Sequence, residues 1–454
     1  MAHFVPHTDA EVEAMLGSLG LSGVEELFSV VPEALRLTAR PTGAGHRHLD
    51  LPDGLPEADV GMEMERLAEG NVVGRDLVCF AGGGAYDHEV PSAVRRLASR
   101  SEFVTAYTPY QPEISQGVLQ ALFEYQTMVA RLAGVEVANA SLYDGASSCV
   151  EAVNLAVAAR GRPAVWVSAG VNPRWRQVLR TCAAGSGHQL FDAALHDGLT
   201  AWDLEAGAGS QDAPAALVVQ HPNYLGCLED LAHARRVADQ HGALLVVAFD
   251  PVAAGLLRSP GSYGADVVVG EGQPFGTPLS FGGPYLGLFA CRSEHVRRLP
   301  GRLVGESLDG EGRRAYVTTL RAREQDIRRE KASSNVCTNQ TLMAVSFAIH
   351  LAWLGTTGLR EMALRCARGT RYAREALLAI DGVEPAAPAP VLREFAVRTP
   401  VPAETVVERM ADEGFLAGIP LGDEYGGGLL VAVTERRTRD DVDAYAAAIE
   451  KVVR

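Results

Sequence analysis

Lysine is nearly absent from this chain. Its 454 residues include 41 Lys and Arg together, of which only Lys331 and Lys451 are lysines and 39 are arginines. Covalent catalysis through an imine needs the amine of a lysine, because the guanidinium group of arginine stays protonated. Chemistry of that kind would therefore have to use one of two positions.

Long apolar runs and a basic N-terminus are also lacking. The first stretch, MAHFVPHTDAEVEAML, has neither the basic start nor the apolar core of a signal peptide. No apolar run reaches the roughly 20 residues that span a bilayer. We therefore expect a cytoplasmic protein with no membrane partner.

Paired cysteines are missing as well. None of the seven cysteines belongs to a C-x-x-C pair: Cys79, Cys149, Cys182, Cys227, Cys291, Cys337 and Cys366. We expect reduced thiols that are buried as small hydrophobic residues. Because the sequence has no H-E-x-x-H motif and no Cys/His cluster, we expect no metal site.

Positive charge is in deficit overall. The 41 basic residues face 56 acidic ones, which gives a formal charge of −15. Such a chain repels polyphosphate backbones, so we expect no nucleic-acid partner. With 47% hydrophobic and 21% charged residues, the composition is that of an ordinary globular protein.

Two glycine-rich segments lack the spacing of nucleotide-binding motifs. FAGGGAYDHEVP and GEGQPFG each miss the third glycine of G-x-G-x-x-G, because Asp87 and Phe275 stand at the required positions. Neither lysine follows a glycine as a P-loop requires. These spacings exclude both kinds of phosphate-binding loop.

What is present divides the chain into three predicted parts. Residues 1–75 alternate short amphipathic helix patterns with Pro and Gly, which indicates a helical arm. In residues 76–335 the apolar runs PAVWVSA, AALVVQ, ALLVVAF and ADVVVG alternate with helical patterns, which predicts an α/β domain with a mostly parallel sheet between helices. Residues 336–454 begin with a long apolar connecting helix and continue as a small α+β C-terminal domain.

The first candidate site is a strand–turn–helix junction. Tyr143-Asp144-Gly145 ends a strand, and a helix is expected from about Ala146. Free N–H groups and the positive end of the helix dipole favour an anion there, and Ser147 and Ser148 could add hydroxyl donors.

Polar residues also follow the next strands. His221 and Asn223 come after AALVVQ, and Asp250 comes at the carboxyl end of ALLVVAF, where ligands bind in open α/β sheets. An acid at that point can pair with the pyridinium nitrogen of pyridoxal phosphate (PLP). Together with the anion-binding turn and a ring-stacking His, it outlines a PLP site of the aspartate-aminotransferase type, fold type I.

The lysine of such a site is missing. It should follow the next strand, ADVVVG, but the chain there reads Gly270-Glu271-Gly272-Gln273. The amide of Gln273 is not nucleophilic and cannot form an imine. Lys331 lies about 58 residues further on and Lys451 is in the last helix, so we expect the isolated chain to be inactive. The rival interpretation is a self-sufficient PLP decarboxylase or lyase that uses Lys331.

Several long segments carry a family resemblance. SRSEFVTAYTPYQPEISQGVLQALFEYQTMVARL, VANASLYDGAS, GADVVVGEGQ, SFGGPYLG and REQDIRREKASSNVCTNQTL make the chain similar, over essentially its whole length, to subunit 1 of glycine dehydrogenase (decarboxylating). This subunit family is the N-terminal half of the glycine cleavage system P-protein.

The resemblance implies a complex. Two such chains would join two copies of a lysine-bearing subunit 2 in an α2β2 heterotetramer, and subunit 2 would bind PLP covalently. That complex decarboxylates glycine, releases CO2 and transfers the aminomethyl group to lipoylated H-protein. Subunit 1 of this family lacks the lysine, which matches Gln273.

Two segments are candidates for what this chain contributes. EFVTAYTPYQPEISQG gathers aromatic and hydrogen-bonding groups in a proline-containing loop, and loops of this kind often line sites: Tyr107, Thr108, Tyr110, Gln111 and Glu113. The alternative is that its tyrosines only pack an interface. The charged stretch Arg321–Lys331 is either a solvated face or a docking site for acidic H-protein or the partner's PLP phosphate.

Two departures from the family keep other functions open. The chain has Gly83 where G-A-G-A-Y-D-H is expected, and Ser147-Ser148 where Thr-Ala is expected. A paralogue recruited to a different α-amino-acid decarboxylation is one alternative, and a non-catalytic scaffold of subunit 2 is another.

Overall fold

The computed structural model describes residues 6–36, 54–72, 74–105, 108–203, 213–280 and 282–454. They belong to two compact units, Met1–Val72 and Val73–Arg454. The first unit contains α1 (Asp9–Ser18), the 3-10 turns η1 (Val24–Phe28) and η2 (Glu33–Leu35), and α2 (Glu57–Glu69). Helix α1 begins at a capping box in which Thr8 and Glu11 satisfy each other's backbone N–H groups. These helices lie within the segment for which the sequence predicts a helical arm.

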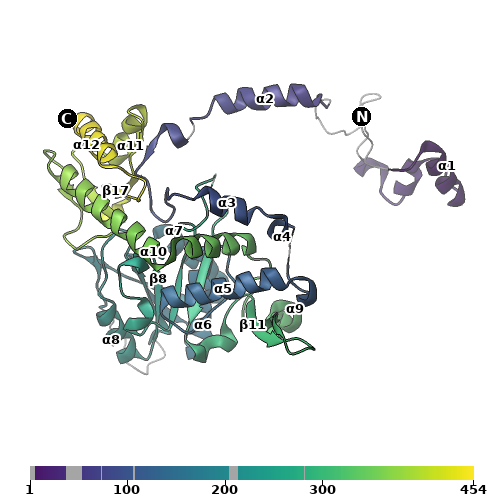
Figure 1. The fold of residues 1–454 in the computed structure, drawn as a ribbon, viewed down its shortest axis with the longest axis horizontal. Coiled ribbons are helices and arrows are strands. Elements are labelled where there is room, and N and C mark those ends of the chain that lie inside the picture. The colour runs from purple at the N-terminus through teal and green to yellow at the C-terminus, as the bar shows by residue number, and fades with distance from the viewer. Residues whose placement is uncertain (1–5, 37–53, 73, 106–107, 204–212, 281) are drawn as a thin grey trace. The chain divides into compact units, whose positions relative to one another are not determined.

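A seven-stranded sheet is the centre of the second unit (Figure 1). Its order is β2 (Val137–Ala138), β10 (Gly287–Cys291), β9 (Val267–Glu271), β8 (Leu244–Phe249), β7 (Ala216–His221), β3 (Ala164–Ser168) and β4 (Gln189–Ala193). The strands from β9 to β4 are parallel, whereas β10 is antiparallel to β9 and β2. The α/β class and the mostly parallel sheet are confirmed.

Helices cover both faces of this sheet because its strands are apolar on both sides. Leu217, Leu245 and Val268 pack on one face with α5 (Gln116–Ala133), α8 (Leu231–His241) and α10 (Thr341–Leu378). Val218 and Val246 pack on the other face with α6 (Gly145–Arg160) and α7 (Pro173–Ser186). Figure 1 shows α5 and α10 running side by side over the sheet.

Helix α10 has an unusual length and a kink. Its backbone leaves the helical conformation at Gly355, where φ is 59°. By length and composition, α10 is the one helix in the described part of the chain that could cross a membrane. Its apolar side chains Ala344, Phe347 and Leu351 are buried in the core beside the sheet, which accounts for that composition.

The C-terminal part forms a smaller antiparallel sheet with helices on it. The sheet has the order β13 (Glu384–Pro385), β14 (Glu394–Arg398), β17 (Leu429–Ala432) and β16 (Ile419–Pro420). It shares a core with α11 (Ala403–Asp412) and α12 (Arg439–Val453), in which Phe80, Phe395 and Tyr445 are fully buried. β1 (Val78–Cys79) pairs with β15 (Phe415–Leu416), so the start of this unit is attached to its end. The domain limits at residues 75 and 335 remain predictions.

The other elements are short connections. They are η3 (Gly74–Asp76), α3 (Ser92–Ala98), α4 (Ser101–Val104), η4 (Pro112–Ile114), β5 (Leu195–His196), β6 (Leu199–Thr200), η5 (Ala253–Gly255), η6 (Pro260–Tyr263), η7 (Ser293–Arg298), the hairpin β11 (Leu303–Leu308) and β12 (Arg314–Thr319), η8 (Arg321–Arg323), α9 (Gln325–Arg328), η9 (Arg329–Lys331) and η10 (Asp423–Tyr425).

Candidate functional site

The strand-end residues predicted from the sequence meet at the carboxyl edge of the central sheet. Asp250 directly follows β8, and Gln273 lies two residues past β9. His221 ends β7 and Asn223 follows it. Asn223 and Asp250 line a small cavity, whose walls also include Tyr86 and Glu271. His221, Gln273, Ser147 and Ser148 are not among the lining residues.

The side chain of Gln273 links two segments of the chain by hydrogen bonds. Its side chain is buried, and its Nε2 donates to the carbonyl oxygens of Tyr86, at 3.0 Å, and Thr277, at 2.8 Å. Its Oε1 accepts a hydrogen bond from the N–H of Tyr86 at 3.0 Å. The amide therefore pins the 82–88 loop to the sheet edge, with its donors and acceptor in use.

Asp250 is already paired within the chain. Its Oδ2 lies 2.9 Å from Nη2 of Arg393, and its Oδ1 accepts from the N–H of Val252 at 2.9 Å. The guanidinium of Arg393 also lies over the ring of Tyr86, with Cζ 3.4 Å from the ring centre. The carboxylate that could pair with a pyridinium thus has an internal, permanently charged partner.

The predicted anion-binding turn is filled by Glu271. Its Oε2 accepts from the N–H of Gly145, the first residue of α6, at 2.9 Å. Its Oε1 accepts from the N–H groups of Gln273, at 3.0 Å, and Leu286, at 2.8 Å. Burial raises the pKa of Glu271 to about 8 in spite of these hydrogen bonds.

The two serines of the turn also have internal partners. The N–H of Ser147 donates to the capping carboxylate of Asp144 at 2.6 Å, and the hydroxyl of Ser148 donates to the carbonyl of Asp144 at 2.9 Å. The indole of Trp175 packs so closely on Gly145 that a Cβ there would lie 2.2 Å from it. The helix terminus that could hold a phosphate is covered by the chain itself.

These residues do not fit a PLP molecule. The cavity has a free volume of about 50 Å³, which is room for only a few water molecules. Sites for ligands of this size need roughly 300 Å³ or more. A wider cleft of about 640 Å³ shares four lining residues with this cavity, among them Trp175 and Glu271, but Asp250 does not line it. In the described part of the chain, neither space brings an anion site and a free strand-end acid together.

The His residue expected to stack on a cofactor ring serves the fold. Nδ1 of His221 accepts a hydrogen bond from the N–H of Glu229 at 3.1 Å. Burial lowers the pKa of His221 to about 4, so the imidazole is neutral. The side chain of Asn223 donates to Glu229 at 2.7 Å and to the carbonyl oxygen of Gly198 at 2.7 Å.

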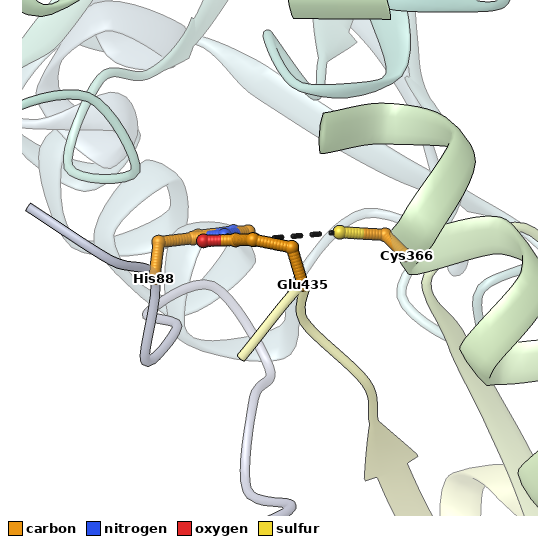
Figure 2. Close-up of side chains that lie close together, drawn as sticks. All are labelled: His88, Cys366 and Glu435. Carbon is orange, nitrogen blue, oxygen red and sulfur yellow. Dashed lines mark hydrogen bonds and ion pairs between the residues drawn. The ribbon is translucent and has the colours of Figure 1, made fainter. Parts of the chain in front are cut away.

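A buried chain of polar groups continues from Asp250 through Arg393 to His88, and Figure 2 shows its far end. Nη1 of Arg393 donates to Nε2 of His88 at 2.8 Å, so the proton of the imidazole is on Nδ1, which lies 2.6 Å from Oε2 of Glu435. The Sγ of Cys366 lies 3.6 Å from the same oxygen (Figure 2). Although burial opposes it, the hydrogen bond from His88 lowers the pKa of Glu435 to about 2.

His88, Cys366 and Glu435 have ligand atoms close enough together to suggest a metal. The separations argue for hydrogen bonds instead. Two nitrogen and oxygen ligands of a tetrahedral zinc lie about 3.3 Å apart, given metal–ligand bonds of about 2.0 Å. The 2.6 Å between His88 and Glu435 leaves room for a shared proton and not for an ion.

The loop proposed to serve another chain lies elsewhere. Tyr107 is outside the described residues. Tyr110, Gln111 and Glu113 are exposed and Thr108 is partly exposed, and none of the four lines the cavity at the sheet edge. Two guanidinium groups, those of Arg302 and Arg321, lie near the ring of Tyr110, each 5.5 Å from its centre.

Neither lysine is at the sheet edge. Lys331 is exposed at the end of η9, and Lys451 lies on α12, where its Nζ is 2.5 Å from Glu413. Sequence reasoning missed Glu271 and Arg393, which pair with groups at the sheet edge, and Glu435, which pairs with His88. The available signal was the presence of charged residues inside or beside apolar runs, as in GEGQ and REFAVRT.

The fold is that of the type I PLP-dependent transferases. Solved structures with this fold include a cysteine desulfurase of Escherichia coli, with a TM-score of 0.59, 14% identity and coverage of 86% of this chain and 98% of that one. At this identity the likeness shows the fold alone. A crystal structure of glycine decarboxylase (P-protein) of the glycine cleavage system, in inhibitor-bound form, has a TM-score of 0.90, 45% identity, and coverage of 99% and 100%.

Sequence relatives agree with this structure. Residues 2–449 match the model of the glycine cleavage system P-protein. The probable glycine dehydrogenase (decarboxylating) subunit 1 of Moorella thermoacetica is 47% identical over 455 residues, 99% of each chain. That of Desulforamulus reducens is 45% identical over 450 residues, 98% of this chain and 99% of that one. The chain belongs to the glycine cleavage system P-protein family, as subunit 1, and the resemblance noted in the sequence is confirmed.

Proposed function

We propose that this chain is the lysine-less subunit of a glycine decarboxylase whose active site is formed jointly with a second subunit. In this proposal a lysine-bearing subunit 2 binds PLP covalently, and the two chains assemble as a cytoplasmic α2β2 heterotetramer. The complex decarboxylates glycine, releases CO2 and transfers the aminomethyl group to lipoylated H-protein. The isolated chain is inactive.

The observation that carries this proposal is the closed sheet edge. Gln273 stands in place of the lysine and makes three hydrogen bonds. Glu271 accepts a hydrogen bond from the first N–H group of α6. A fold that fills its own site with internal side chains retains its shape and can still present loops to a neighbour. The PLP required by the reaction must then reside on the partner, where it serves as the electron sink.

The residues that this chain contributes are proposed to be those of the exposed loop: Tyr107, Thr108, Tyr110, Gln111 and Glu113. Side chains of this kind can position a substrate and shield it from water without doing covalent chemistry. The support is their placement. Tyr110 is 50% exposed although it is aromatic, which suits a side chain that is buried only on assembly.

The test is substitution of the loop within the assembled complex. Tyr110→Phe and Glu113→Gln should leave co-purification with subunit 2 intact and lower the rate of glycine–bicarbonate carbon exchange by about tenfold or more. Glu124→Gln, an exposed change on α5, is the control. Normal exchange in the loop variants would favour a scaffold without a role in the site. Exchange with another amino acid in preference to glycine would favour a recruited paralogue.

A further inference from the structure

A groove of about 440 Å³ on the second unit is lined by positive charge. Its walls carry five cationic side chains and no acidic one: Arg297, Arg298, Arg323, Arg328 and Lys331. They come from η7, η8, α9 and η9, and a hydrogen bond from Arg323 to the carbonyl oxygen of Leu299 holds these turns together. The groove is positively charged although the formal charge of the whole chain is −15.

These cations lack carboxylate partners. Among the described residues, none of the five has an acidic oxygen within 4.0 Å, whereas many arginines elsewhere do, such as Arg180, Arg235 and Arg436. Four of the five, all except Arg323, are exposed. An unpaired cluster of like charges destabilises the free chain through mutual repulsion, so it indicates a need for an anion.

Arg323 is an independent indication that the groove binds an anion. Its Nε and Nη2 are buried without a hydrogen-bond partner, and a charged donor left unsatisfied is costly. Arg323 is also one of the residues that line the groove. An oxyanion that enters the groove could pair with the exposed heads first and, after a small adjustment, with this edge of Arg323.

The layout favours an acidic polypeptide over a single small anion. Small phosphate sites gather backbone N–H groups at a helix terminus around one point. Here long side chains from several turns are spread along an open groove. Such an arrangement attracts and orients a protein surface of opposite charge. The groove also adjoins the proposed partner-facing loop, since Arg321 in η8 lies 5.5 Å from the ring centre of Tyr110.

We propose that this groove docks an acidic segment of a second polypeptide, through carboxylates that pair with Arg297, Arg298, Arg328 and Lys331. The proposal goes beyond the proposed function and rests on it only for the closeness of the groove to the loop around Tyr110; its test measures binding of carboxylates and not glycine turnover.

The test measures binding of a fluorescent oligoglutamate peptide to the full-length chain by anisotropy, at low and at physiological salt. The groove variant is Arg297→Gln, Arg298→Gln, Arg328→Gln and Lys331→Gln combined. The control is Arg360→Gln, Arg365→Gln, Arg368→Gln and Arg371→Gln, which removes the same number of positive charges from exposed positions of α10. Circular dichroism checks that both variants fold.

We expect salt-sensitive binding that the groove variant weakens by about tenfold or more and the control by about twofold or less. Equal weakening in both variants would mean that only overall charge matters, and the proposal would fail. It would also fail if the peptide did not bind at low salt. Displacement by inorganic phosphate, under conditions where chloride of equal ionic strength has no effect, would make the groove a small-anion site instead.

Discussion

Restoring the missing lysine should not restore cofactor binding. In a Gln273→Lys chain the N–H of Tyr86 loses its acceptor, and an ammonium group must lie in a position where the native side chain is 1% exposed. An unsatisfied buried N–H costs about 1–3 kcal/mol, and desolvation of the charge adds to this. We expect the free energy of unfolding to fall by about 3 kcal/mol in total. The carbonyl oxygens of Tyr86 and Thr277 can still accept from the ammonium, which limits the loss.

Cofactor binding should fail for a separate reason. The side chain of Glu271 still accepts a hydrogen bond from the first N–H of α6, and the cavity of about 50 Å³ is unchanged. Urea unfolding would measure the stability, and titration with PLP would follow the absorbance of an imine. Gln177→Lys on the exposed face of α7 controls for non-specific imine formation. A stoichiometric absorbance band in the Gln273→Lys chain, absent from the control, would refute the account of a closed site.

Three further predictions concern buried groups. Burial raises the pKa of Glu271 to about 8, above its unfolded value, so its contribution to stability should fall as pH rises from about 4.5 to 8; urea unfolding across this range should show the fall in the native chain and not in Glu271→Gln. The pKa of Glu435 is lowered to about 2, so its contribution is present above pH 4.5 and is lost as pH falls toward 2. Glu435→Gln should therefore cost about 1–3 kcal/mol at pH 7, with a difference that shrinks in acid, and the exposed change Glu375→Gln should cost little. Of the seven cysteines, the exposed Cys182 and Cys337 should react rapidly with a thiol reagent. Cys149 and Cys291 should react only on unfolding, because burial raises the pKa of each to about 12.

The sequence predicted the fold well because its signals are local. Runs such as ALLVVAF and ADVVVG are apolar on both faces, and they form β8 and β9. The helix expected from Ala146 begins at Gly145, where Asp144 caps it. The kink of α10 at Gly355 was not predicted, since a single glycine in an apolar helix pattern has several structural outcomes.

Sequence reasoning placed polar residues at one sheet edge but did not predict their partners, and their role in a site stays a prediction. The chain order placed Asp250 and Gln273 at one sheet edge, as strand topology requires. The closure depends on contacts between residues far apart in the sequence, such as Asp250 with Arg393 and His88 with Glu435. A local sequence pattern does not predict which distant side chain will fill a cavity.

The most direct test of a shared site compares the chain alone with the reconstituted complex. The absorbance spectrum with PLP and the glycine–bicarbonate carbon exchange would be measured for this chain, and then after addition of a matching subunit 2 and lipoylated H-protein. The account predicts no imine band and no exchange from the chain alone, and both after mixing. A band and decarboxylation from the single chain would contradict it and would return attention to Lys331.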